Sequence, residues 1–493
     1  MQDPAAKVIV IGSGIAGLAA AIRLASAGRQ VIVYEKNGYP GGKLHAFEQN
    51  GYHFDAGPSL FTQPQQLAEL FALAGEPLND YFQYRRLPVS CHYFYEDGTC
   101  LKAYADRELF KKEIAEKTSA DPARLDTYLA NASKAYSRIG SVFLDHSLHK
   151  PKTLWKAPVS KALLATRWPY LFRSLHQFNR KQLVDEKLVQ LFDRYATFNG
   201  SDPYRAPGML SMIPHLEHNE GAFYPQGGMI SIVNALYQLA LKKGVEFHFN
   251  APVQRIIAHE NKAVGVVVNN SNILSTAVLS NIDSYFTYRY LLGDERSAKK
   301  IARQERSSSA MIFYWGIKKE FPRLDLHNIF FSGDYKAEFD HLFRSKSVYY
   351  DPTVYVNISS KQEPGRQAPA GKENWFVMVN TPASNGQDWT AYRQQYRQAV
   401  IEKLNRALQT DIESLIETET VMDPAGIETS SGSFMGALYG TSSNSRLAAF
   451  LRHPNFSKRI AGLYFAGGSV HPGGGIPLCM RSAKIAANLI LQG

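Results

Sequence analysis

The sequence has little cysteine and no long apolar run, and each absence excludes some classes of protein. Its three cysteines, Cys91, Cys100 and Cys479, are an odd number without the spacing of metal ligands. We therefore expect reduced thiols, with neither a disulfide framework nor a metal site. No stretch of about 18 consecutive apolar residues occurs, so no transmembrane helix is predicted. The first apolar run starts close to the N-terminus and belongs to a β-α-β pattern, not to a signal peptide. We expect a cytoplasmic protein.

Acidic residues are fewer than basic ones. The chain has 44 Asp and Glu against 55 Lys and Arg, which gives a net charge of +11. This balance favours an anionic partner surface without identifying it. No nucleic-acid-binding motif accompanies the charge, so we predict no nucleic-acid partner. With 493 residues, 45% of them hydrophobic, the chain is long enough for two or more domains with substantial cores.

The N-terminal stretch has the pattern of a dinucleotide-binding unit. The apolar run Val8–Ile11 predicts a buried parallel strand. Gly12, Gly14 and Gly17 follow it with the spacing G-x-G-x-x-G, and an alanine-rich helix and a second strand come next. The helix N-terminus offers unpaired N–H groups to phosphates. Glu35, at the end of the second strand, can accept hydrogen bonds from ribose hydroxyls. The unit therefore predicts a bound dinucleotide.

Two further glycine-containing turns follow this unit. Residues 40–43 read Pro-Gly-Gly-Lys, and residues 54–59 read Phe-Asp-Ala-Gly-Pro-Ser. Adjacent glycines let backbone lie against a flat cofactor or its phosphates, and Lys43 would bring a positive charge there. Together with the N-terminal motif, these turns resemble the flavoprotein amine oxidase and phytoene desaturase superfamily. The resemblance implies FAD as the cofactor, with the first glycine motif holding its ADP part.

The C-terminal glycine-rich stretch narrows the resemblance. Residues 467–477 read G-G-S-V-H-P-G-G-G-I-P, ahead of an alanine-rich helix. This run is similar to the (G/A)-x-x-x-H-P-G-x-G-(I/V)-P motif of bacterial-type carotenoid desaturases, and residues 221–229 resemble a second motif of that family. The Gly-Gly-Lys turn and the run Phe-Tyr-Pro-Gln-Gly-Gly-Met are more similar to its 1-hydroxycarotenoid 3,4-desaturase branch than to its phytoene desaturases.

The resemblance implies an α/β fold with a Rossmann-like FAD-binding domain of the amine oxidase and phytoene desaturase type. That domain is expected to comprise residues 1–105, 223–285 and 425–493. A helical membrane-associating subdomain would occupy 106–222, and a substrate domain with a mixed sheet would occupy 286–424. The positions that match the family's cofactor-binding residues are Gly12, Gly14, Ile15, Ala16, Gly17, Glu35, Lys36, Gly42, Lys43, Gly57, Pro58, Ser59, Leu60, Val253, Asn281, Gly468, Gly475, Ile476, Pro477, Leu478 and Met480.

Residues 150–181 form a basic segment. Its 32 residues contain eight Lys or Arg and no acidic residue. A basic, aromatic, amphipathic segment is typical of helices that lie on an anionic bilayer, although a pair of buried core helices would show the same pattern. We expect peripheral contact with the cytoplasmic face of a membrane. The apolar residues at helical spacing are Leu164, Trp168, Leu171, Leu175 and Phe178.

The resemblance implies a carotenoid substrate, from which a flavin takes a hydride while loss of a proton completes a new double bond. We expect 3,4-desaturation of a 1-hydroxylated acyclic or monocyclic carotenoid. Phytoene desaturation is the alternative, and a non-redox FAD carotenoid isomerase is a further one. Two alternatives belong to other functional classes: a binding protein without turnover, similar to the prenyl-protein chaperones related to this superfamily, and an amine oxidase.

The sequence assigns no catalytic residue. Asp145, Glu217 and Asp340 are candidate proton acceptors, and nothing in the sequence selects one of them. His471 lies in the C-terminal glycine-rich loop, where we expect it to brace the loop. Because no second nucleotide motif is present, we expect oxygen or a membrane quinone as the electron acceptor, and not NADPH.

Overall fold

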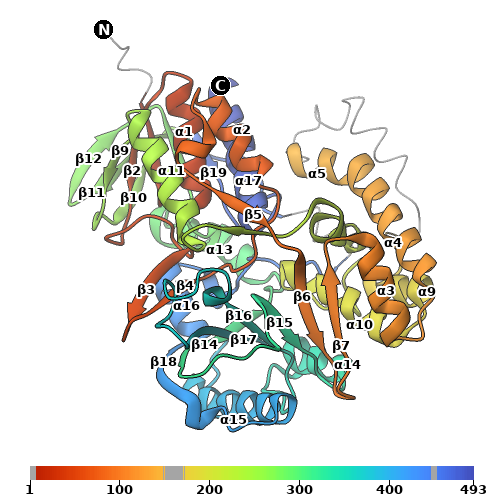
Figure 1. Ribbon diagram of the computed structural model, residues 1–493. Coiled ribbons are helices and arrows are strands. Elements are labelled where there is room, and N and C mark those ends of the chain that lie inside the picture. The colour runs from red at the N-terminus through yellow and green to blue at the C-terminus, as the bar shows by residue number, and fades with distance from the viewer. Residues whose placement is uncertain (1–6, 148, 150–169, 171, 446–451, 493) are drawn as a thin grey trace.

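The computed structural model describes residues 7–147, 149, 170, 172–445 and 452–492, and only these are discussed below. A five-stranded parallel sheet contains the predicted dinucleotide unit and lies in the upper part of Figure 1. Strand β1 pairs in parallel with β13 on one side and with β2 on the other. In spatial order the strands are β19 (Leu463–Phe465), β13 (Ala277–Ser280), β1 (Lys7–Ile11), β2 (Gln30–Tyr34) and β9 (Glu246–His248).

The two faces of this sheet are covered by different layers. Because side chains alternate along a strand, Val8 and Val10 point to one face and Ile9 and Ile11 to the other. The valines pack in one core with four helices, and the isoleucines pack in another with an antiparallel three-stranded sheet. The helices are α1 (Ile15–Ser26), α2 (Gln65–Leu73), α11 (Ile230–Lys242) and α17 (Ile476–Gln492), and the strands are β10 (Val253–His259), β11 (Lys262–Val268) and β12 (Ser271–Leu274).

A larger, seven-stranded sheet forms the second lobe, below the first in Figure 1. It is mixed, since β15 and β6 run parallel while the other neighbours are antiparallel. In spatial order its strands are β18 (Ile416–Met422), β14 (Ser309–Ile317), β17 (Glu373–Thr381), β16 (Val354–Ile358), β15 (His327–Phe330), β6 (Val89–Phe94) and β7 (Cys100–Tyr104). The range 1–105 therefore includes two strands of the larger sheet.

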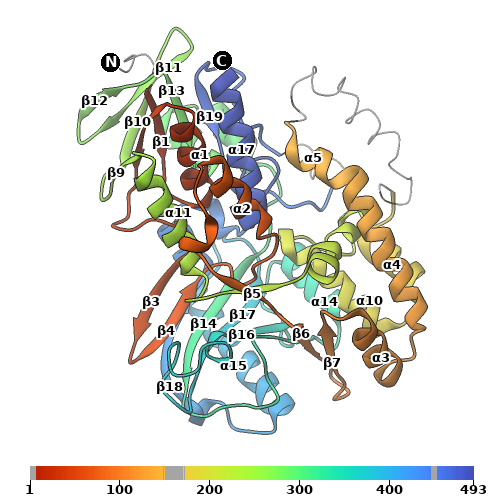
Figure 2. The ribbon, with the colours of Figure 1, turned by 45° about the horizontal axis from the view of Figure 1, so that its top comes forward.

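Two further antiparallel strand pairs lie outside the two large sheets. The pairs are β3 (His45–Gln49) with β4 (Tyr52–Ala56) and β5 (Tyr84–Arg86) with β8 (Phe223–Pro225). Figures 1 and 2 both show a helical region beside the larger sheet, away from the five-stranded one. Its helices are α3 (Arg107–Lys117), α4 (Pro122–Ala135), α5 (Ser141–Asp145), α9 (Leu175–Leu183) and α10 (Glu186–Asp193). The remaining helices are α12 (Ser284–Phe286), α13 (Glu295–Ala302), α14 (Tyr335–Asp340), α15 (Trp389–Leu408) and α16 (Pro424–Ser431).

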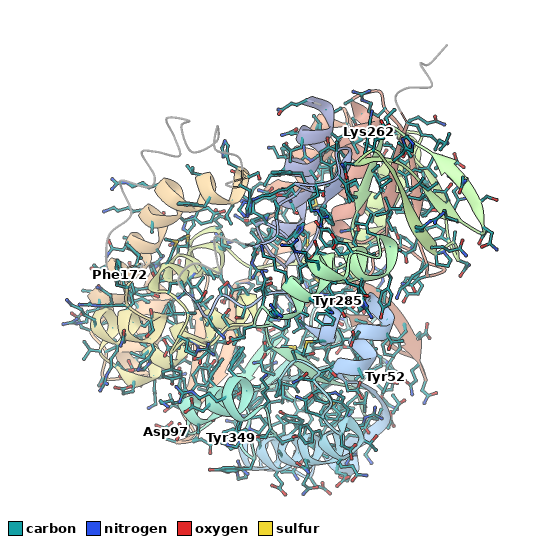
Figure 3. All side chains as sticks on the ribbon, turned by 180° about the vertical axis from the view of Figure 1, so that it is seen from behind. Tyr52, Asp97, Phe172, Lys262, Tyr285 and Tyr349 are labelled. Atoms are coloured by element: carbon teal, nitrogen blue, oxygen red, sulfur yellow. The ribbon has the colours of Figure 1, made fainter. Side chains whose placement is uncertain are left out.

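The basic segment is described only at its C-terminal end. Two residues of the apolar stripe, Leu175 and Phe178, are buried in α9. Phe178 packs in the core of the helical region, and Leu175 packs in a smaller cluster with Ala196, Ala206 and Leu210. These two residues therefore follow the core-helix interpretation. Phe172 is 47% exposed and lies on the outer surface of this region in Figure 3. Residues 150–169 and Leu171 lie outside the described residues. None of the described helices combines the length and the apolar composition needed to cross a bilayer.

Candidate functional site

One cavity of about 850 Å³ runs from the carboxyl ends of β1 and β2 to the larger sheet. The predicted cofactor residues come together on its wall, with the exception of three. Gly17 is a packing residue, because a Cβ there would come within 2.1 Å of the carbonyl oxygen of Gly12. Met480 is 1% exposed and packs in the core beside α1, and Leu478, like Gly17 and Met480, does not line the cavity.

The N-terminus of α1 faces the cavity through backbone alone. Gly14 precedes the helix, and the first turn contains no acidic residue that could occupy the free N–H groups. A Cβ on Gly42 would lie 3.3 Å from the Cα of Gly14, so the second glycine turn closes directly over the first. This arrangement leaves room for a phosphate against the positive end of the helix dipole.

Glu35 is at the far end of the same wall and is 5% exposed. Its Oε2 accepts hydrogen bonds of 2.8 Å from both the backbone N–H and the hydroxyl of Ser13, and its Oε1 accepts one of 2.9 Å from the Asn37 N–H. A carboxylate oxygen can accept two hydrogen bonds, so Oε1 keeps one position for a ribose hydroxyl. Lys36 and Val253 line the cavity beside it.

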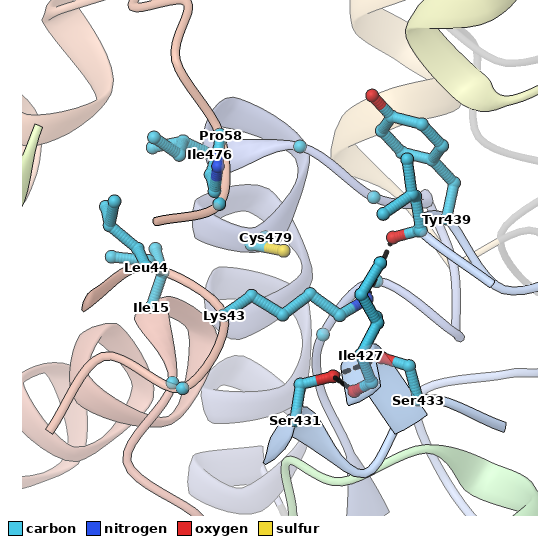
Figure 4. Close-up of a pocket in the computed structure, with 18 of the residues that line it drawn as sticks. Ile15, Lys43, Leu44, Pro58, Ile427, Ser431, Ser433, Tyr439, Ile476 and Cys479 are labelled. Carbon is cyan, nitrogen blue, oxygen red and sulfur yellow. Dashed lines mark hydrogen bonds between the residues drawn. The ribbon is translucent and has the colours of Figure 1, made fainter. Parts of the chain in front are cut away.

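Lys43 crosses from the second glycine turn to the C-terminal part of the chain, as Figure 4 shows. Its Nζ donates hydrogen bonds of 2.8 Å to the carbonyl oxygen of Leu438 and 3.4 Å to that of Ala437. Burial lowers the pKa of Lys43, and the charge of Asp283 partly opposes this shift. Lys43 thus ties one side of the cavity to the other and places its amino group in the cavity wall.

The C-terminal glycine-rich loop forms the opposite wall. Asn281, after β13, donates a hydrogen bond of 2.8 Å to the carbonyl oxygen of Ala466, and this bond holds the start of the loop beside the sheet. A Cβ on Gly468 would lie 3.3 Å from the Cα of Gly474, so backbone packs on backbone here. The loop leads into α17, whose first turn also lacks an acidic residue. Two open helix N-termini therefore border one cavity, and its residues fit a dinucleotide.

His471 has the bracing role predicted from its position. It is 3% exposed, its Nε2 lies 2.9 Å from the carbonyl oxygen of His146, and its backbone N–H donates to His453. It does not line the cavity. Of the three candidate proton acceptors, Asp145 pairs with Arg481 and Asp340 is ion-paired on α14, whereas only Glu217 lines the cavity.

The cavity-lining residues described above, which fit a dinucleotide, are called the cradle below. Beyond the cradle, the cavity is bounded by residues that the sequence analysis did not name as site residues. Phe376, Met378 and Asn380 come from β17, and Ile312 and Tyr314 come from β14. Both sets follow the two-residue period of a strand, so they mark one face of the larger sheet. The two-residue alternation of these strands could have been found in the sequence. The sequence could not show that this face of the sheet borders the cofactor cavity.

A buried charged pair also reaches this part of the cavity. Arg194 donates a hydrogen bond of 2.7 Å to the Tyr93 hydroxyl, and its Nη2 lies 3.4 Å from Oε2 of Glu217. Burial raises the pKa of Glu217 and the Arg194 charge lowers it, and the net direction is below the ordinary value. Glu217 is therefore ionised at neutral pH, although it is 3% exposed.

Comparisons with known proteins agree with this geometry. The family model of flavin-containing amine oxidoreductases matches residues 15–491. A 1-hydroxycarotenoid 3,4-desaturase of Flavobacterium sp. (strain P99-3) is 52% identical over 98% of this chain and 99% of its own. A 4,4'-diaponeurosporene oxygenase of Staphylococcus haemolyticus (strain JCSC1435) is 32% identical, with 98% and 97% covered. The crystal structure of an oxidoreductase from Methanosarcina mazei superposes with a TM-score of 0.64 at 15% identity, covering 99% of this chain and 100% of its own, which shows the shared fold.

Proposed function

The chain belongs to the family of flavin-containing amine oxidoreductases, and from this premise we propose that it desaturates the 3,4 bond of a 1-hydroxylated carotenoid. It is an FAD-dependent oxidoreductase. The 52% identity to a 1-hydroxycarotenoid 3,4-desaturase over nearly the whole of both chains supports the substrate class. The observation that carries the proposal is that one continuous cavity joins the dinucleotide-binding residues to a chamber lined by aromatic and aliphatic side chains.

The reaction removes a hydride and a proton from neighbouring carbons, and a C=C bond forms between them. When bound, FAD supplies the two-electron acceptor for the hydride. The protein has to hold a long hydrocarbon beside the flavin and exclude water. Tyr314, Phe376 and Met378 provide an apolar wall for this purpose, and all three line the cavity. No strong nucleophile is required. The glycine-rich turns are proposed to bind the cofactor through backbone N–H groups and shape, and Glu35 is proposed to bind it through its carboxylate.

The test is conversion of a 1-hydroxylated acyclic carotenoid in liposomes by the purified, FAD-loaded protein. We expect an absorption maximum at longer wavelength, because conjugation is extended, and a product lighter by two hydrogens. Separate reactions with oxygen and with a membrane quinone identify the electron acceptor, which we propose is one of these two. Conversion of phytoene in place of the hydroxylated substrate would support the alternative, and a spectral change without loss of hydrogen would indicate an isomerase.

We further propose that the protein meets its substrate at a membrane surface through the basic segment 150–181. The eight Lys and Arg without an acidic residue support this, since such a segment is attracted to anionic lipid. The variant in which Lys150, Lys152, Lys156 and Lys161 are changed to Glu is expected to lose co-sedimentation with liposomes that contain anionic lipid. Exchange of Lys242, Lys243, Lys299 and Lys300 for Glu makes the same change of charge elsewhere and serves as the control. Equal binding by both variants would contradict the proposal.

A further inference from the structure

We propose that His327 donates a hydrogen bond to the hydroxyl oxygen on carbon 1 of the substrate, and that this contact selects hydroxylated carotenoids. The inference rests on the proposed function. His327 begins β15, lines the cavity and is 4% exposed. Its Nε2 atom is buried and has no hydrogen-bond partner among the described residues. Leaving a buried polar group unpaired is unfavourable, so this atom points to a ligand.

The hydrogen bonds on the other side of the ring determine what His327 offers. Nδ1 lies 2.7 Å from the Tyr355 hydroxyl and 3.1 Å from the amide nitrogen of Asn357. The same amide nitrogen donates to the carbonyl oxygen of Leu326 at 3.2 Å, which fixes the orientation of the amide. An amide N–H group can only donate, so Nδ1 accepts and the proton of the neutral ring is on Nε2. Burial lowers the pKa of His327 to about 4, which keeps the ring neutral at working pH.

His327 is also close to the expected position of the reacting bond. The Tyr355 hydroxyl that contacts its ring lies 2.8 Å from the hydroxyl of Ser59. His327 is therefore two hydrogen bonds away from the turn 57–60, which is proposed to contact FAD. In a 1-hydroxycarotenoid, carbon 1 is two carbon–carbon bonds from carbon 3. Whatever binds the hydroxyl therefore has to lie beside the flavin, and His327 meets this requirement.

Glu217 supplies the complementary acceptor. A hydroxyl group donates as well as accepts, and the Glu217 carboxylate lines the same cavity. Its Oε1 makes no hydrogen bond of full geometry among the residues described, and the Ser90 and Tyr195 hydroxyls lie beside the carboxylate. After burial, the nearby carboxylate of Glu217 is the strongest influence on the pKa of His327, and it raises that pKa. Arg194 neutralises the charge of Glu217 from the other side. A donor and an acceptor together match an alcohol and do not match a hydrocarbon end.

The size of the expected selectivity follows from this arrangement. A carotene without the hydroxyl would leave the buried His327 N–H group without a partner. Sites that hydrogen-bond a substrate hydroxyl reject the analogue that lacks it by about 10⁴-fold to 10⁵-fold. We expect wild-type protein to prefer the hydroxylated substrate by at least about 100-fold in kcat/KM.

The experiment compares His327→Phe with the wild type on two substrates, a 1-hydroxylated acyclic carotenoid and the same carotene without its hydroxyl. The preference is expected to fall from about 100-fold to below about 10-fold. kcat/KM for the hydroxylated substrate should fall, whereas kcat/KM for the carotene should not fall, because the variant has no N–H group for the carotene to leave unpaired. His92→Phe is the matched control, because His92 is a buried histidine on the neighbouring strand β6 that does not line the cavity. It should keep the preference.

Each outcome separates the inference from the proposed function. If the wild type converts neither substrate, the proposed function fails. If the wild type prefers the hydroxylated substrate and His327→Phe keeps that preference, or loses activity equally on both, only the role of His327 fails. Bound flavin and the thermal denaturation midpoint show whether the variant is folded. If His327→Phe does not fold, His327→Met, with a flexible side chain that has no donor, takes its place and is judged by the same ratio.

Discussion

Gly14→Val is expected to give a folded protein that has lost its FAD. Gly14 precedes α1 with φ −64° and ψ 171°, an extended conformation that valine adopts readily. A Cβ there would lie 2.8 Å from Oδ1 of Asn281, and the branched side chain would enter the cavity at the helix N-terminus. We expect FAD to bind about 100-fold more weakly, which corresponds to about 2.7 kcal/mol. Because every turnover needs the flavin, activity should fall with occupancy.

The measurement is the ratio of flavin to protein absorbance after purification, followed by titration of the apoprotein with FAD. Gly38→Val is the control. Gly38 lies in the loop after β2, and its φ is not in the left-handed range. A Cβ there would lie 3.4 Å from Asn250, and Gly38 does not line the cavity. This variant should remain yellow. A Gly14→Val protein with wild-type affinity would contradict the assignment of the cradle.

The cradle could be predicted from the sequence because its determinants are local. A glycine spacing, a helix start and an acid at a strand end all lie within a few tens of residues, and α1, β2 and α17 form where the pattern predicts them. The family resemblance then connected the N-terminal and C-terminal motifs. Eighteen of the named residues line one cavity, and Gly17 and Met480 pack the elements that support it.

The substrate side of the cavity could not be predicted in the same way, because it depends on long-range pairing. Strand β6 pairs with β15, which lies more than 200 residues further along the chain. Nothing in the sequence of either strand indicates that the two strands pair. His327 has no motif around it, and its unpaired Nε2 shows only when Tyr355 and Asn357 are placed beside it. Likewise, an amphipathic helix has one apolar face whether that face contacts lipid or protein. The sequence alone therefore could not decide whether Leu175 faces a membrane or the protein core.

Buried histidines should make the folded state sensitive to acid. In the unfolded chain their pKa is about 6.5. Since the folded-state values are lower, the unfolded state binds more protons as the pH falls from about 6.5 to about 4, and stability is lost across that window. Each histidine then accounts for a loss of about 3 kcal/mol by pH 4. Burial lowers the pKa to about 4 for His218, His327, His453 and His471.

Buried carboxyl groups act in the opposite direction, so the total pH profile does not isolate the histidines. Burial raises the pKa of Glu338 to about 7 and that of Asp202 to about 6, and it also raises the pKa of Asp55 and Asp193. Groups with a raised folded-state pKa stabilise the fold at low pH and lose that contribution as pH rises. The two sets partly cancel, and a single histidine has to be measured by difference.

His453→Gln is expected to gain about 3 kcal/mol of stability relative to the wild type between pH 7 and pH 4. Gln keeps a donor and an acceptor for the partners of His453, the Pro454 carbonyl and the Tyr288 hydroxyl, but it takes up no proton. The cationic side chain of Lys458 lies near His453 and further disfavours the charged ring. The free energy of unfolding is measured by urea titration at each pH. His259→Gln, at an exposed position, should follow the wild type throughout. If the free energy of unfolding of His453→Gln had the same pH dependence as that of the wild type, the pKa of His453 would be the same in the folded and unfolded states. Burial would then not lower that pKa.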